Sequence, residues 1–265
     1  MNFELTEERQ MLQDTLRRFL ADKYDVKTRN AILESDEGMS TDIWTQLAEL
    51  GVLGALFTED DGGFGGAGFD IAVVFEELGR AGVVEPILET CLLAGGLVAA
   101  LGNETQKGLL ESIIGGETRL ALAHGEPRSR YDLNRVETTI ENGKISGHKS
   151  MVMGAPNADH VIISARESGG VDDQEGISLF LVSTSDLDMR STPVMGGGMA
   201  ADIYLDGMAI TDDMRLGPIG GVFAYLETVY AAATTAICAL DPVRIRLLFW
   251  RFSWRRWPGA RELEA

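Results

Sequence analysis

The chain has 265 residues, enough to bury a sizeable core and to hold more than one domain. Its apolar share of 45% and charged share of 24% are ordinary for a soluble globular protein, and its formal charge of −18 disfavours nucleic acid, whose phosphates it would repel. Two isolated cysteines, Cys91 and Cys238, fit a reducing cytoplasm. The histidines His124, His148 and His160 show no metal-ligand spacing with them, so no metal site is predicted.

Residues 1–117 are predicted to form a helical domain. Residues 1–20 are amphipathic and charged throughout, which argues against a secretory signal peptide. Thr6 is placed to cap a first helix over residues 7–23. Further helices are expected over residues 41–50, 69–79 and, with an interruption at Gly102 and Asn103, 86–115.

A glycine-rich stretch between these helices matches the dinucleotide fingerprint G-x-G-x-x-G through Gly63, Gly65 and Gly68. A nucleotide loop needs a strand before it and a parallel strand after its helix, but residues 86–101 have helical length and composition. The three acids at residues 59–61 would also crowd negative charge beside a pyrophosphate. We therefore favour a helix–loop–helix connection, in which glycines permit close backbone approach.

Short alternating runs begin near Arg119 and predict a β domain over residues 118–220. Asn142-Gly143 is a strong signal for a type I′ hairpin turn. Many short strands with polar turns favour a small β-barrel or sandwich. The expected strands cover residues 120–123, 136–140, 144–147, 151–153, 161–165, 177–182 and 202–210.

A polar turn follows the first of these strands and is the best candidate for chemistry. A strand end with small residues and backbone amides suits a flat heteroaromatic ring such as a flavin. His124 is either a structural histidine hydrogen-bonded in the turn or a contact to the ring edge. Arg128 and Arg130 are either solvated charges or bidentate partners of a substrate carboxylate.

Met151 and Met153 form a second candidate segment. Both side chains alternate into the β-domain core, or else they cover a ring face through their polarizable sulfur atoms. The sequence leaves both alternatives open.

The chain changes character after a helix expected over residues 222–240. Asp241-Pro242 should break that helix, and residues 241–265 hold six arginines against three acids, a net of +3. We favour a reading-frame disruption over a cationic segment that lies on an anionic membrane with Leu247, Trp250, Trp254 and Trp257 at helical spacing. Glu227 and several tyrosines and threonines make a membrane span over residues 222–240 an unfavoured interpretation.

Three short sequence motifs in the helical region resemble those of a known family. Residues 44–51 spell W-x-x-L-A-E-L-G, residues 59–66 spell E-x-x-G-G-x-G-G, and residues 76–80 spell E-E-L-G-R. In this order they resemble the N-terminal helical domain of the acyl-CoA dehydrogenase family. The resemblance extends to about residue 240.

Two β-domain segments resemble the flavin-bordering segments of that family. The family's aromatic-x-x-Thr-Glu-Pro is matched by Glu126-Pro127, with Leu122 at the aromatic position and Gly125 at the threonine. The family's G-x-K-x-W-I-T-N-A is matched from Gly147, with Met151 at the tryptophan and Met153 at the threonine. The resemblance implies FAD held by Leu122, His124, Gly125, Ser129, Met151, Val152 and Met153, and substrate held by Arg128, Arg130 and Tyr131.

The resemblance implies an α+β fold in four parts: an N-terminal helical domain (1–117), a middle β-barrel domain (118–220), the truncated start of a C-terminal helical bundle (221–240) and an aberrant tail (241–265). The activity it implies is α,β-dehydrogenation of an acyl-CoA, in which a carboxylate base removes the α-proton and flavin accepts hydride. No residue matches the family's base, so we expect no catalytic residue here and no turnover by this chain alone.

Residues 123–131 (A-H-G-E-P-x-S-R-Y) resemble the small subunit of pimeloyl-CoA dehydrogenase, which implies a dicarboxylyl-CoA substrate. The alternative to an enzyme is a non-catalytic partner subunit of a full-length acyl-CoA dehydrogenase paralogue, in a homo- or hetero-oligomer; a third is an inactive remnant. A cytoplasmic location is expected, without nucleic acid or membrane.

Overall fold

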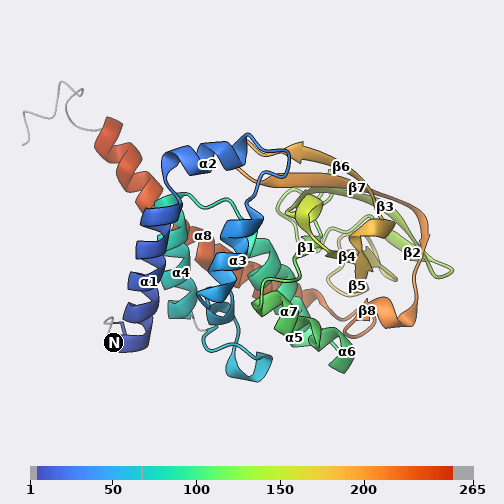
Figure 1. Ribbon diagram of the computed structural model, residues 1–265. Coiled ribbons are helices and arrows are strands. Elements are labelled where there is room, and N and C mark those ends of the chain that lie inside the picture. Colours follow the sequence, from blue (N-terminus) through green and yellow to red (C-terminus); the bar gives the residue numbers. More distant parts are fainter. Residues whose placement is uncertain (1–4, 67, 253–265) are drawn as a thin grey trace, which may run out of the picture.

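The computed structural model describes residues 5–66 and 68–252, with side-chain environments up to Leu240. A helical N-terminal part, a mixed sheet and one long C-terminal helix follow each other along the chain (Figure 1). The α+β class in three described parts is therefore confirmed. The first helices are α1 (Glu7–Lys23), α2 (Val26–Leu33), α3 (Thr41–Glu49) and α4 (Gly68–Ala81). A π-helical segment (Leu88–Gly95) leads into α5 (Gly96–Leu101), α6 (Glu104–Lys107) and α7 (Leu109–Ile114).

Side-chain caps fix where these helices begin. The Thr6 hydroxyl accepts a hydrogen bond from the Arg9 amide at 3.3 Å, as the sequence predicts for α1. Asp25 caps α2 through the Thr28 amide at 2.7 Å. Helix α2 is not predicted by the sequence pattern, because its eight residues bury only Ile32 and show no clear apolar stripe.

The glycine-rich loop does not form the strand–turn–helix of a nucleotide-binding loop. Its glycines pack closely against the backbone of the preceding residues. Residues 53–57, which a nucleotide loop would need as a strand, contain the 3₁₀ turn Gly54–Leu56. A Cβ atom on Gly63 would collide with the carbonyl oxygens of Gly54 and Phe57, and one on Gly65 would collide with that of Ala55. These glycines allow close backbone packing, which agrees with the helix–loop–helix prediction.

The β domain is a mixed sheet with strand order β6-β7-β3-β2-β4-β5-β8, and β1 pairs with β4 in parallel. The Asn142-Gly143 turn between β2 and β3 has positive φ at both residues, 52° and 71°, as a type I′ turn requires. The two runs predicted at 144–147 and 151–153 form one strand with an irregularity between them. The bounds are β1 (Leu120–Ala123), β2 (Thr139–Glu141), β3 (Lys144–Met153), β4 (His160–Arg166), β5 (Ile177–Ser183), β6 (Asp188–Pro193), β7 (Met199–Ala209) and β8 (Arg215–Leu216).

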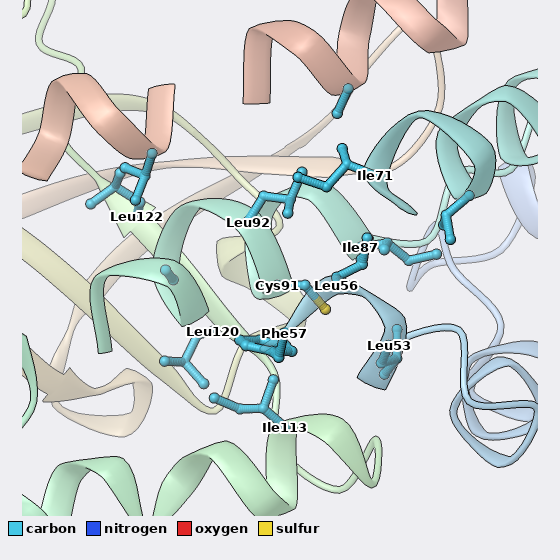
Figure 2. Close-up of a cluster of buried hydrophobic side chains, with 14 of the residues drawn as sticks. Leu53, Leu56, Phe57, Ile71, Ile87, Cys91, Leu92, Ile113, Leu120 and Leu122 are labelled. Carbon is cyan, nitrogen blue, oxygen red and sulfur yellow. The ribbon is translucent and has the colours of Figure 1, made fainter. Parts of the chain in front are cut away.

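Strand β1 is buried on both faces and joins two cores. Leu120 and Leu122 belong to the large apolar cluster of the helices, while Ala121 and Ala123 belong to a second cluster inside the β domain. Figure 2 shows Leu120 with Phe57 and Ile113 in the first cluster. Because alternate residues of a strand face opposite sides, each core fixes one half of β1. The polar turn after Ala123 is therefore held by both.

Helix α8 (Phe223–Phe252) runs through Asp241-Pro242, so the predicted helix break at that point is wrong. A proline removes one intrahelical hydrogen bond, and here this loss does not end the helix. The hypotheses for the Arg/Trp-rich tail concern side chains that lie outside the described residues. Among the described helices, only Phe223–Leu240 is long and apolar enough to span a membrane, which is weak evidence for a span. Here its buried face (Leu226, Val229, Ala233 and Ala236) packs into the protein.

The contact between α4 and α8 depends on Gly79. An ideal Cβ at Gly79 would lie 2.5 Å from the Leu240 carbonyl oxygen and 2.8 Å from its Cα. We expect Gly79→Ala to push the two helices apart and to lower the free energy of unfolding by about 1–3 kcal/mol. Urea denaturation followed by circular dichroism measures this change.

Gly68→Ala is the matched control in the same helix, because nothing lies within 4 Å of its ideal Cβ. We expect this variant to be neutral or slightly stabilising. Equal destabilisation by both substitutions would show that the effect of Gly79→Ala does not come from its contact with α8.

Candidate functional site

The predicted flavin-bordering segments meet at a bulge in β3. The register of β3 against β7 shifts between Lys149 and Val152, and Met151 within this bulge has a φ of 54°. A left-handed conformation at a non-glycine residue costs roughly 1–3 kcal/mol and is concentrated at functional sites. The bulge turns the Met151 side chain outward, leaving it 55% exposed, whereas Val152 is buried. Met153, at the end of the strand, is half-buried.

The turn after β1 lies against this bulge. The Ser150 amide donates to the Gly125 carbonyl at 2.9 Å, which ties the two predicted segments together. Gly125 is half-buried, and Leu122 is 8% exposed. Within the described residues, the Gly125 N–H makes no hydrogen bond, so it remains a donor. The structure thus brings Gly125 and Met151 to one surface region, whereas Leu122 is buried in the helical core.

A buried ion pair lies directly beneath. The Lys149 ammonium donates to Glu126 Oε1 at 2.6 Å and to Ser164 Oγ at 3.0 Å, and its side chain is fully buried. The Glu126 carboxylate also accepts hydrogen bonds from the backbone amides of Glu137 at 2.6 Å and Thr138 at 3.0 Å. One carboxylate therefore holds the end of β1, strand β3 and the segment that enters β2.

His124 is buried within the same network. One ring nitrogen, Nδ1, lies 2.8 Å from Ser164 Oγ, and Nε2 lies 2.8 Å from the Leu133 carbonyl oxygen. Because both nitrogens already have partners inside the protein, the geometry fits a structural histidine better than a flavin-edge contact. Ser129 is likewise buried, and its hydroxyl donates to the Glu126 carbonyl oxygen at 3.0 Å.

Burial controls the charges of this network. Burial, reinforced by the Lys149 charge, lowers the pKa of His124 to about 4, so the ring is neutral at pH 7. Burial also lowers the pKa of Lys149, to about 8, against the opposing attraction of Glu126. For Glu126 burial acts to raise the pKa, but the Lys149 charge and the hydrogen bonds outweigh it, so the net shift is downward. The pair is therefore ionised at neutral pH.

A cavity of about 320 Å³ opens beside the end of β3. Its apolar lining comes from the loop before α3, from α4, from the π-helical segment, from β3 and from α8. The apolar side chains include Met39, Phe75, Leu88, Met153, Ile237 and Leu240. Its charged groups are Glu85 and Glu89. Glu85 accepts from Tyr24 at 2.9 Å and from the Ser40 amide at 3.2 Å, whereas the Glu89 carboxyl has no partner from another described residue. Burial raises the pKa of both carboxyls.

The residues predicted to hold substrate lie on an exposed turn. Arg128, Arg130 and Tyr131 are exposed, Tyr131 almost completely, and none of them lines the cavity. Arg130 has a φ of 50°. The structure therefore does not bring these three side chains together with the cavity, and their contact with substrate stays a prediction.

The structural roles of Lys149, Ser164 and Asp202 are not predicted from the sequence. Alternation along β3 gave a usable signal for Lys149, because Ile145 points inward and residues 147 and 149 share its side of the strand. A lysine on the inward face requires a buried partner, and Glu126 was the nearest acid in the matching segment. Nothing in the sequence indicated the bulge. Within the described residues, no group of three or more His, Cys, Asp or Glu side chains could hold a metal ion.

Comparisons with known proteins agree with this architecture. Residues 6–117 match the model of the acyl-CoA dehydrogenase N-terminal domain. The (2S)-methylsuccinyl-CoA dehydrogenase of Cereibacter sphaeroides is 30% identical over 236 residues, which cover 82% of this chain and 43% of that protein. The chain spans about half the length of the curated relatives it matches. These matches support the acyl-CoA dehydrogenase family.

Two solved structures share the fold over almost the whole chain. The ChsE4–ChsE5 complex of Mycobacterium tuberculosis is 22% identical with a TM-score of 0.79, over 97% of this chain and 70% of that one. The FAD complex of PigA is 20% identical with a TM-score of 0.79, over 97% of this chain and 71% of that one. At these identities the likeness establishes the fold alone.

The buried His124 predicts a loss of stability in acid. Its folded pKa of about 4 lies below the unfolded value of 6.5, so below pH 6.5 the unfolded chain binds the extra proton and stability falls as the pH drops toward 4. By pH 5 this histidine alone should remove about 2 kcal/mol. Glu126, with its lowered pKa, acts in the same direction at lower pH.

We expect His124→Gln to flatten the fall in urea-unfolding free energy between pH 7 and pH 5, although it costs some stability at pH 7. His160→Gln, at the partly exposed start of β4, is the control and should keep the wild-type slope. An unchanged slope in His124→Gln would mean that the folded protein accepts the imidazolium.

Proposed function

We propose that this chain carries the first two domains of an acyl-CoA dehydrogenase-like flavoprotein and binds FAD where the β3 bulge meets the Gly125 turn. The observation that carries the proposal is the strained, outward-turned Met151 beside the Gly125 N–H, which makes no hydrogen bond within the described part of the chain. Together they offer an apolar cover for a ring face and a donor for a ring edge. Family membership supports FAD as the ring.

The residues present fit a flavin of this kind. The exposed Met151 thioether suits a flat π-system, and Gly125 leaves room for close approach of a ring edge. Bound FAD would supply the hydride acceptor of the reaction. This chain's residues would orient the ring, since the Glu126–Lys149 pair fixes both segments from below. No residue of this chain is assigned as the proton-abstracting base.

The cavity supports an acyl-CoA as the substrate. It begins at Met153, two residues beyond the bulge, and its walls are mostly apolar, as an acyl chain requires. Among the described residues, the lining has no cationic side chain that could pair with a carboxylate placed there. We therefore propose an acyl-CoA whose chain is apolar within the cavity. A dicarboxylyl-CoA such as pimeloyl-CoA would have to place its distal carboxylate at Arg128 or Arg130 instead.

A non-catalytic partner subunit is the second candidate, and one face of α8 favours it. Opposite its buried side, the helix exposes small residues spaced four and three apart: Ala224, Thr228, Ala231, Thr235 and Cys238. Small side chains at this spacing let another helix approach closely. A second acyl-CoA dehydrogenase chain would supply such helices, so we propose a homo- or hetero-oligomer.

Retention of FAD tests the first proposal. After incubation with FAD and gel filtration, we expect the purified chain to keep a visible flavin absorption band. We also expect Gly125→Thr to bind FAD about 3- to 10-fold more tightly, because it adds one hydroxyl donor. The fold should accept this residue, since an ideal Cβ at Gly125 meets only the Ser150 carbonyl oxygen, at 3.4 Å.

Gly125→Ala separates the hydroxyl from the added carbon and should leave FAD affinity close to that of the wild type. Absence of bound flavin from both the wild type and Gly125→Thr would refute FAD binding by this chain. If Gly125→Ala binds FAD as tightly as Gly125→Thr does, the gain in affinity comes from the added carbon and not from the hydroxyl.

Sedimentation analysis tests the partner-subunit candidate. We expect the chain to associate with itself or with an acyl-CoA dehydrogenase paralogue, and Ala231→Arg on the outer face of α8 to abolish that association. Glu141→Arg, at the exposed end of β2 and away from α8, is the charge control. A monomer at all concentrations, with and without the paralogue, would exclude this candidate.

A further inference from the structure

The Met151 conformation needs a cause, because most of β3 is regular. Three non-glycine residues in the described chain have positive φ. Asn142 belongs to the type I′ turn, and Arg130 lies in an exposed turn. Met151 is the exception, since it lies inside a strand whose pairing with β7 continues on both sides, at Lys149 and at Val152. Something outside the local sequence must hold it.

The bulge removes Met151 from the β3–β7 backbone ladder, and a side chain replaces the missing acceptor. The ladder pairs Lys149 with Ile203 and Val152 with Ala201, so that Ser150 and Met151 together lie opposite Asp202. The Met151 amide donates instead to Asp202 Oδ1 at 3.0 Å. A backbone amide left without an acceptor beneath a bound ring would be costly, so this carboxylate completes the local hydrogen bonding.

Asp202 is placed for this role by β7. It lies between Ala201 and Ile203, both buried, so its own side chain points to the outer face where Met151 emerges. Its second oxygen lies 3.7 Å from His148 Nε2. The hydrogen bond from Met151 is the main reason that the pKa of Asp202 is lowered, which keeps the acceptor ionised.

We propose that Asp202 is a positioning residue that locks the β3 bulge in the form that presents Met151 and the Gly125 turn to the flavin. The Ser150–Gly125 hydrogen bond holds the bulge from one side, and the Asp202–Met151 hydrogen bond holds it from the other. Loss of the second would let Met151 relax toward regular strand geometry and move the surface beneath the ring. This inference rests on the proposed FAD site.

The test uses three variants of the full chain. Asp202→Ala removes the acceptor, and Asp202→Asn keeps an oxygen acceptor without the charge. Asp206→Ala removes an exposed carboxylate four residues further along β7. Two quantities are measured for each: hydrogen exchange of the Met151 amide, and the Kd for FAD by fluorescence titration. Thermal unfolding confirms that each variant folds.

We expect Asp202→Ala to exchange the Met151 amide at least about 10-fold faster and to weaken FAD binding about 10-fold. Asp202→Asn should restore most of both, and Asp206→Ala should match the wild type. Wild-type behaviour of Asp202→Ala in both measurements, or equal losses in Asp206→Ala, would overturn the inference. If Asp202→Ala fails to fold, the comparison of Asp202→Asn with Asp206→Ala decides. Wild-type exchange and FAD binding in Asp202→Asn support the positioning role. Loss of FAD binding in Asp202→Asn, with the Met151 amide still protected from exchange, contradicts it.

The exchange measurement needs no flavin, so the two proposals fail separately. A wild-type chain that binds no FAD refutes the proposed function, while fast exchange in Asp202→Ala would still show that Asp202 holds the bulge. Slow exchange in Asp202→Ala, with FAD bound normally, refutes the positioning role alone.

Discussion

The buried pair of Glu126 and Lys149 is the constraint on which the candidate site depends. A charge inside a protein is tolerated only when it is paired and hydrogen-bonded, and here the carboxylate has both an ammonium and two backbone amides. Removing one partner of such a pair typically costs roughly 3–5 kcal/mol, because the other is left buried and unpaired. The pair therefore ties the end of β1 to β3 and to the segment that enters β2.

Two apolar cores hold the strand that leads into this polar network. Leu120 and Leu122 pack one face of β1 into the helical core (Figure 2). Ala121 and Ala123 pack the other face into the β-domain core. The strand therefore has little freedom to slide or rotate. The turn that follows inherits this rigidity, although it is irregular itself. A rigid strand end, a buried ion pair and a carboxylate-held bulge place two sequence-distant segments on one surface.

Much of the fold could be predicted from local patterns. Capping by Thr6, the Asn142-Gly143 turn and the apolar periodicity of α1, α3 and α4 are each written within a few residues. Features that depend on distant partners could not be predicted. Short α2 has little apolar face, the bulge at Met151 depends on Asp202, and α8 continues through Pro242. For the site, the segments were found, but the buried state of His124 and the role of Lys149 required the contacts themselves.

The two cysteines have opposite environments, and this gives the chain a built-in chemical reporter. Cys91 lies buried in the π-helical segment, where burial raises the pKa of its thiol, so almost no thiolate forms there at neutral pH. Cys238 lies exposed on the small-residue face of α8. A thiol-selective label should therefore mark one atom of the folded protein, on the surface where a second helix would dock. Its accessibility reads out whether that surface is open or covered, without any substitution in the sequence.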